Sequence, residues 1–234
     1  MFGLKNFINK IFAKFVRKLI KFLLMFTFHI GKLNSIKNYL HENSFKDNDK
    51  LGEYEIGDVL KKYQWIIRKF EDPTICSLGF MHHGYIHDIT DTVYIIEYGC
   101  ETELKIDAEV KKVSLNQFLK EDLNYEFFLY QFDENHQNDF TTILEKSLSR
   151  IGEKKYNFLT NTCEDLCVDI LIKPEFHTNY QNQIRYLLDF PNSKNFYCYY
   201  SSKIIKDTET IKKFIPCRYN KDNNKIQVFK NPLE

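Results

Sequence analysis

The stretch YNFLTNTCEDL, residues 156–166, decides how the rest of this chain is interpreted. It predicts a loop that runs into a helix, because Asn161 is a favourable N-cap residue and Glu164 follows at the capping-box spacing. Cys163 then falls in the first helical turn. Unpaired backbone N–H groups and the positive end of the helix dipole stabilise a thiolate at that position. The stretch therefore predicts a nucleophilic cysteine that needs a base.

Two neighbouring histidines upstream, His82 and His83, supply the candidate base. They fall in a predicted strand, residues 79–87, which would hold an imidazole in place. The next predicted strand, residues 92–98, carries Glu97 among apolar residues. A carboxylate buried there needs a partner, and a histidine would supply one. Cys163 is thus the candidate nucleophile, one of the two histidines, His82 or His83, is the candidate base, and Glu97 is the candidate orienting group.

Each of these residues also has a structural interpretation. A buried cysteine is more often an inert thiol than a nucleophile, and a buried histidine is more often a satisfied structural group than a catalyst. Glu97 would face solvent if its strand lay at the edge of the sheet. The residues by themselves leave these alternatives open.

Composition limits the class of protein. The 234 residues are 43% hydrophobic and 28% charged, which suits one domain of ordinary size with extensions. The formal net charge of +1 argues against nucleic-acid binding. Six cysteines are scattered without the spacing of a disulfide scaffold, which indicates reduced thiols in a cytoplasmic protein.

The first 32 residues predict an amphipathic helix with a lysine-rich polar face, since no acidic residue precedes Glu42. Such a helix binds anionic lipid, so we expect a membrane surface to be a partner through residues 2–30. The uncharged run within it, residues 22–30, is too short to span a bilayer. We therefore expect peripheral or monotopic membrane association. The alternative is that the helix packs on its own domain or on a partner helix. Residues 33–53 are polar and predict a linker.

The remaining chain predicts an α+β fold, a small antiparallel sheet with packed helices. Residues 54–173 form the expected central domain, and residues 174–234 form a C-terminal extension of unassigned role. Residues 63–70 fit a strand or a short helix equally well. Further predicted elements are strands or hairpins at 104–113, 125–132, 196–200 and 225–229, and helices after Ser114 and at 141–151, 181–188 and 208–214.

Several motifs in residues 54–173 together resemble the lecithin:retinol acyltransferase family. The segment HHGYI, residues 82–86, is similar to the family's histidine box, and SLNQFL, residues 114–119, is similar to its Ser-Leu-Asp-Glu-Phe-Leu segment. Gly57-Asp58 resembles the family's opening pair. The block from Leu148 to Leu166, which ends in NTCEDL, resembles its Asn-Asn-Cys-Glu block and is the most specific match.

This resemblance implies a circularly permuted papain-like fold in which Cys163 accepts an acyl group. By the His-x-Gly register it implies His82 as the base, with His83 as the second candidate because neighbouring strand residues face opposite ways. It also implies a thiol acyltransferase or phospholipase A, with a membrane phospholipid as substrate and no cofactor. Many family members carry a second histidine where this chain has Glu97, so the chain departs from the pattern there. A catalytically inactive membrane-tethered binding protein and a papain-like amidase or peptidase are the alternatives.

A zinc site is a weaker alternative. Cys163 and Cys167 are one helical turn apart, and His83 and His87 are four residues apart. The paired Cys-x-x-Cys spacings of structural zinc sites are missing from the sequence, so we expect no metal. The number of subunits cannot be deduced from these patterns.

Overall fold

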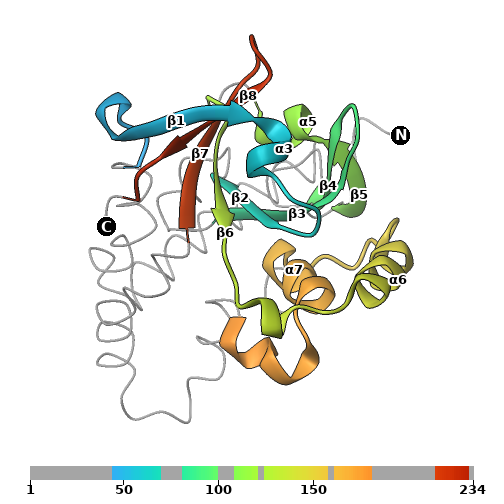
Figure 1. Cartoon of the computed structure of the whole chain (residues 1–234). Coiled ribbons are helices and arrows are strands. Elements are labelled where there is room, and N and C mark those ends of the chain that lie inside the picture. Colours follow the sequence, from blue (N-terminus) through green and yellow to red (C-terminus); the bar gives the residue numbers. More distant parts are fainter. Residues whose placement is uncertain are drawn as a thin grey trace, which may run out of the picture.

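The fold is α+β and is built on one eight-stranded antiparallel sheet (Figure 1). The structure is a computed structural model that describes residues 44–69, 81–99, 108–120, 124–157, 161–180 and 214–231. The expected membrane-binding helix at 1–32 and the expected elements at 181–188, 196–200 and most of 208–214 lie outside the described residues.

Strands β2 to β5 follow one another along the chain, as do helices α6 and α7 and strands β7 and β8. The strands are β1 (Lys50–Glu55), β2 (Trp65–Lys69), β3 (Met81–Ile89), β4 (Val93–Gly99), β5 (Glu109–Ser114), β6 (Glu126–Tyr130), β7 (Phe214–Asn220) and β8 (Lys225–Phe229). The α-helices are α3 (Ile56–Val59), α5 (Leu115–Leu119), α6 (Phe140–Arg150) and α7 (Cys163–Leu171). Short 3-10 helices are η2 (Asp47–Asp49), η4 (Glu134–His136) and η5 (Pro174–Tyr180).

The sheet is larger than the sequence predicted. Its strand order is β1-β8-β7-β6-β2-β3-β4-β5, and every neighbouring pair is antiparallel. Strands β7 and β8 come from the expected C-terminal extension, yet they lie between β6 and β1. The same sheet therefore continues past residue 173. Pairing between distant segments is set by tertiary packing, which local sequence patterns do not report.

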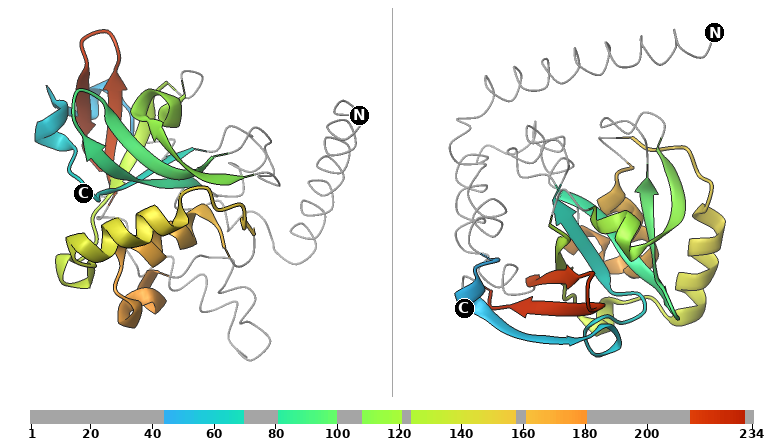
Figure 2. Two further views of the ribbon diagram at one scale, coloured as in Figure 1. Left: turned by 90° about the vertical axis from the view of Figure 1, so that its right-hand side faces the viewer. Right: turned by 90° about the horizontal axis from the view of Figure 1, so that it is seen from above.

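Helices cover both faces of the sheet. Helices α6 and α7 lie together on one face, and α3 and α5 lie on the other (Figures 1 and 2). Each face has its own hydrophobic core, and successive residues of β2, β3, β4 and β6 alternate between the two. We call the side that packs on α7 the thiol face, because Cys163 belongs to its core. The other side is the α5 face.

Local signals predicted several elements well. The capping box at Ser114 and Gln117 is formed and opens α5. Helix α6 ends as expected, since Gly152 follows it with φ +85°, a backbone conformation that favours glycine. Strand β8 has the predicted bounds, and the ambiguous segment 63–70 contains strand β2. A buried hydrogen bond, Tyr85 Oη to Ser147 Oγ at 2.7 Å, ties β3 to α6.

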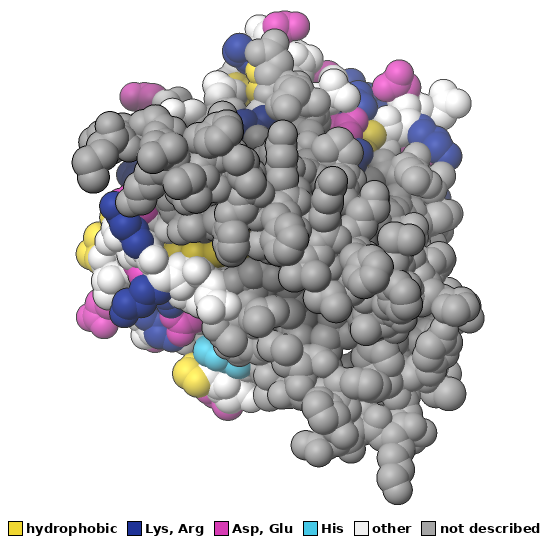
Figure 3. Space-filling view, turned by 180° about the vertical axis from the view of Figure 1, so that it is seen from behind, with side chains coloured by type: hydrophobic (Ala, Val, Ile, Leu, Met, Phe, Trp, Pro, Cys, Tyr) yellow, Lys and Arg dark blue, Asp and Glu magenta, His cyan; other side chains and the backbone are white. Residues whose placement is uncertain are grey.

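The described surface carries both signs of charge. In Figure 3, Lys and Arg side chains lie beside Asp and Glu side chains along the described margin of the rear face. Among the residues that the structure describes, no helix is long and apolar enough to cross a membrane.

Candidate functional site

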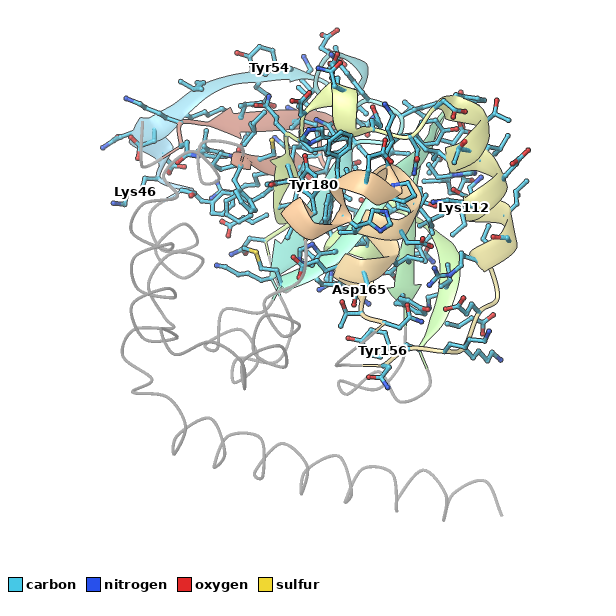
Figure 4. All side chains as sticks on the ribbon, turned by 90° about the horizontal axis from the view of Figure 1, so that it is seen from below. Lys46, Tyr54, Lys112, Tyr156, Asp165 and Tyr180 are labelled. Carbon is cyan, nitrogen blue, oxygen red and sulfur yellow. The ribbon has the colours of Figure 1, made fainter. Side chains whose placement is uncertain are left out.

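Cys163 is the first residue of α7, as predicted, but the cap is one residue later than expected. Thr162 is the N-cap, and its Oγ1 accepts a hydrogen bond from the Asp165 backbone N–H at 3.2 Å. The Asp165 carboxylate in turn accepts from the Thr162 N–H at 2.8 Å. Asn161 cannot be the cap because its backbone pairs with Asn157 in an isolated β-bridge. In Figure 4, Asp165 marks this end of α7.

The Cys163 thiol is buried against the sheet. Its side chain and backbone are only 3% exposed, and Sγ lies 4.0 Å from the carbonyl oxygen of Met81 on β3. Cys167, one turn further along α7, is also buried and free of a disulfide. The helix start therefore holds the thiol directly beside the strand that carries both histidines.

His83 shares the thiol face with Cys163. Met81, His83 and Tyr85 point to one side of β3, because side chains alternate along a strand, and Met81 and Tyr85 belong to the same core as Cys163. Trp65 on β2 donates its indole N–H to His83 Nδ1 at 3.1 Å. Neither ring is solvent-exposed. Nothing in the local sequence pattern links Trp65 to this histidine, so the contact could not be predicted from the sequence.

His82 faces the other way, and this corrects the expected pairing of His82 with Cys163. Its Nε2 forms an ion pair with the Glu97 carboxylate, and its ring lies 5.4 Å from that of Phe118 on α5. Both residues are buried, His82 at 1% and Glu97 at 6% exposure. The predicted contact between His82 and Glu97 is confirmed, but it is made on the α5 face.

The solvent-exposed alternative for Glu97 is wrong. Strand β4 is an interior strand, between β3 and β5, and all its residues except the partly buried Tyr94 are buried. Arg68 of β2, opposite His82 in the register, is also buried and lies over the Phe118 ring, 5.4 Å from its centroid. The α5 face thus holds a buried set of two basic residues and one acidic residue. A buried carboxylate is tolerated because the imidazole pairs with it.

Burial also raises the pKa values of two other side chains, Tyr85 and Cys217. Burial raises the pKa of the Tyr85 hydroxyl above its usual range, although the hydrogen bond to Ser147 opposes the shift. Complete burial raises the pKa of the Cys217 thiol well above its ordinary value. Cys217 is therefore an inert core thiol, which leaves the α7 cysteines as the reactive candidates in the described part of the chain.

The zinc alternative gains no support from the geometry. Within the described ranges, no group of three or more His, Cys, Asp or Glu side chains is arranged to hold a metal ion. His87 lies at the register shift between Ile86 and Asp88, four residues further along β3 than His83.

No protein-family model, curated protein sequence or solved structure matches this chain. The resemblance to the lecithin:retinol acyltransferase family therefore stays a prediction drawn from the motifs. The class that the described residues define is an α+β protein with a capped, helix-initial cysteine packed on a histidine-bearing strand.

Proposed function

We propose that this protein is a thiol-dependent lipid acyltransferase or phospholipase A that forms a thioester on Cys163. One observation carries the proposal: the thiol at the start of α7 packs on the face of β3 from which His83 projects. The motif resemblance supplies the substrate class, acyl esters of phospholipids. A permuted papain-like fold belongs to the same proposal.

The reaction would use His83 in place of the expected His82. Cys163 Sγ attacks the ester carbonyl carbon, the thiol proton passes to the imidazole, and the imidazole protonates the departing alcohol. An acceptor alcohol, an amine or water then attacks the thioester and regenerates the thiol. The helix start favours this chemistry, because its N–H groups stabilise negative charge on the sulfur and on the carbonyl oxygen.

The Trp65 hydrogen bond adds one condition to this sequence of steps. An imidazole Nδ1 that accepts from an N–H carries no proton, so the neutral His83 ring carries its proton on Nε2. For His83 to take up the thiol proton at Nδ1, the indole must give up this bond. The same contact stabilises the neutral ring while substrate is absent.

Trapping of an acyl group on the protein tests the proposal. The full chain is incubated with vesicles of a phospholipid labelled in its acyl chains, and bound label is located by mass spectrometry. We expect hydroxylamine-labile label on Cys163 in the wild type and in C167A, but not in C163A. Binding to vesicles without label or turnover would overturn the enzyme proposal.

The second candidate is a lipid-binding protein without catalysis. The burial of Cys163 and the placement of the His82–Glu97 pair on the α5 face favour it. The labelling experiment separates the two candidates, since the binding protein would bind vesicles but take up no acyl label on Cys163. Cleavage of a peptide or amide by the wild type, with no ester transfer, would instead indicate the amidase alternative. Membrane contact through residues 2–30 is part of the proposal and is tested by deleting them.

A further inference from the structure

Arg150, the last residue of α6, is the centre of a polar network around the loop that leads into α7. The Arg150 guanidinium forms ion pairs with Glu153 through Nε at 2.7 Å and with Asp169 through Nη1 at 2.6 Å. Its Nη2 donates to the Asn161 side-chain oxygen at 3.1 Å and to Tyr98 Oη at 3.3 Å. The network thus joins the end of α6, the following loop, β4 and α7.

Asn161, two residues before Cys163, uses its whole side chain in this network. Its Nδ2 lies 2.9 Å from Tyr98 Oη, 3.0 Å from Glu153 Oε1 and 2.9 Å from the Lys155 carbonyl oxygen. Its Oδ1 accepts from Arg150, and its backbone pairs with Asn157 through hydrogen bonds of 3.0 and 2.9 Å. The amide is therefore committed to the protein and is not a donor aimed at a substrate.

The network is partly buried, and its Arg150 guanidinium lies between two carboxylates, those of Glu153 and Asp169. Burial alone would raise the pKa of Glu153, but hydrogen bonds from Tyr98, Asn161 and Arg150 outweigh it and lower that pKa. Burial, with the Glu153 carboxylate as acceptor, raises the pKa of Tyr98 to about 12. The carboxylate is thus ionised and the phenol is neutral at physiological pH. These charge-assisted hydrogen bonds are the stronger kind, so they fix the backbone at residue 161.

We propose that Asn161 is a positioning residue for the Cys163 thiol, and that the Arg150–Glu153–Tyr98 cluster holds it. This inference rests on the proposed thiol chemistry, which it deepens. Only Thr162 separates the fixed residue from the thiol, and Thr162 is itself fixed by its capping box with Asp165. The network therefore sets where α7 begins and where Sγ stands against β3. Small displacements of a nucleophile cost large factors in rate.

Alkylation of the individual thiols tests this placement without any acyl donor. Asn161→Leu keeps the side-chain size but removes all four polar contacts. With iodoacetamide as the probe, we expect Cys163 to alkylate about fivefold faster in N161L than in wild type, because the helix start opens locally. Cys167 should keep its wild-type rate. Acyl labelling of Cys163 should fall by about tenfold or more.

Asn138 provides a matched control at the other end of the same helix. Its Nδ2 donates to the carbonyl oxygens of Ile170 and Ile172, both at 2.9 Å, so it also ties α7 through a buried amide. N138L should lower the melting temperature without raising the Cys163 rate relative to Cys167. Equal increases at both thiols in N161L, or the same selective increase in N138L, would overturn the inference.

Exchanging the amide and the carboxylate between positions 161 and 153 should restore the contact that each single variant disturbs. N161D alone places two carboxylates together, and E153Q alone replaces the charged acceptor of the Asn161 amide by a neutral one. The double variant N161D/E153Q keeps one amide, one carboxylate and the net charge, so we expect both the Cys163 alkylation rate and the acyl labelling to return to within about threefold of wild type. No rescue would contradict a pairwise role. If the wild type takes up no acyl label, the proposed function fails, while the alkylation rates still decide whether Asn161 holds the thiol.

Discussion

The indole nitrogen of Trp65 lies 3.1 Å from His83 Nδ1, and this hydrogen bond fixes one face of β3 beside the Cys163 thiol. The two rings also meet nearly edge to face, with centroids 5.7 Å apart. The immediately preceding residue, His82, makes its ion pair on the opposite face. Two neighbouring histidines therefore have different chemical roles, and the alternation of the strand separates them.

Trp65→Phe should release the imidazole while retaining the aromatic packing. We expect wild-type His83 to show a single neutral tautomer with its proton on Nε2, and W65F to show a mixture, by nitrogen-15 NMR of the ring. Loss of the bond should also cost about 1 kcal/mol of stability. The same tautomer distribution in both proteins would show that the indole does not control the ring.

Acyl labelling of Cys163 should distinguish the roles of His82 and His83. We expect H83Q to lose acyl labelling of Cys163, because it removes the base on the thiol face. The double variant H82Q/E97Q replaces the buried ion pair by a neutral hydrogen-bonding pair, which avoids leaving one charge unpaired. It should retain label within about threefold of wild type, since it alters only the α5 face.

The reverse pattern, with label lost in H82Q/E97Q and kept in H83Q, would restore His82 as the base. Thermal unfolding of both variants provides the control, because a variant that has lost its fold says nothing about the base. For that reason the single variant H82Q is a poor choice. It would leave Glu97 buried and charged without its imidazole, at a cost of about 3–5 kcal/mol.

Glu153 gives the stability a defined pH dependence. Its pKa is lowered from the ordinary value of 4.5, so its contribution is present above that pH and is lost as the pH falls through the folded-state value. Wild type should therefore be more stable than E153Q at pH 7, and the difference should shrink below about pH 4.5. Urea unfolding at several pH values measures it. A difference that stays constant down to pH 3 would contradict the ionised network.

Replacing two glycines, Gly84 and Gly57, by alanine should have different effects on the stability of the fold. A Cβ on Gly84 in β3 would lie 2.8 Å from Ile95 Cγ2, 3.0 Å from the Ile96 carbonyl oxygen and 3.0 Å from Phe118 Cε2. Because one of these atoms is backbone, G84A should cost about 1–3 kcal/mol. A Cβ on Gly57 in α3 would meet nothing within 4 Å, so G57A should be neutral or stabilising by up to about 1 kcal/mol. Equal effects would contradict the close packing of α5 on β3.

Local patterns were sufficient wherever a short segment sets its own structure. The Ser114 capping box, the α6 helix with Gly152 after it and strand β8 follow from residues within a few positions of each other. The cap of α7 was misplaced by one residue for the opposite reason. Asn161 suits an N-cap by itself, but Arg150, Glu153 and Tyr98 engage its amide from other segments. Such competition is invisible in a local sequence.

The sequence by itself determined that Cys163 begins a helix, that His82 and His83 share a strand, and that the fold is α+β. Only the tertiary structure decided which histidine faces the thiol, because a strand turns successive side chains to opposite faces and the side that α7 covers depends on how the whole sheet is assembled. The tertiary structure also decided that Glu97 pairs with His82 on the α5 face, while Trp65 holds His83 on the thiol face.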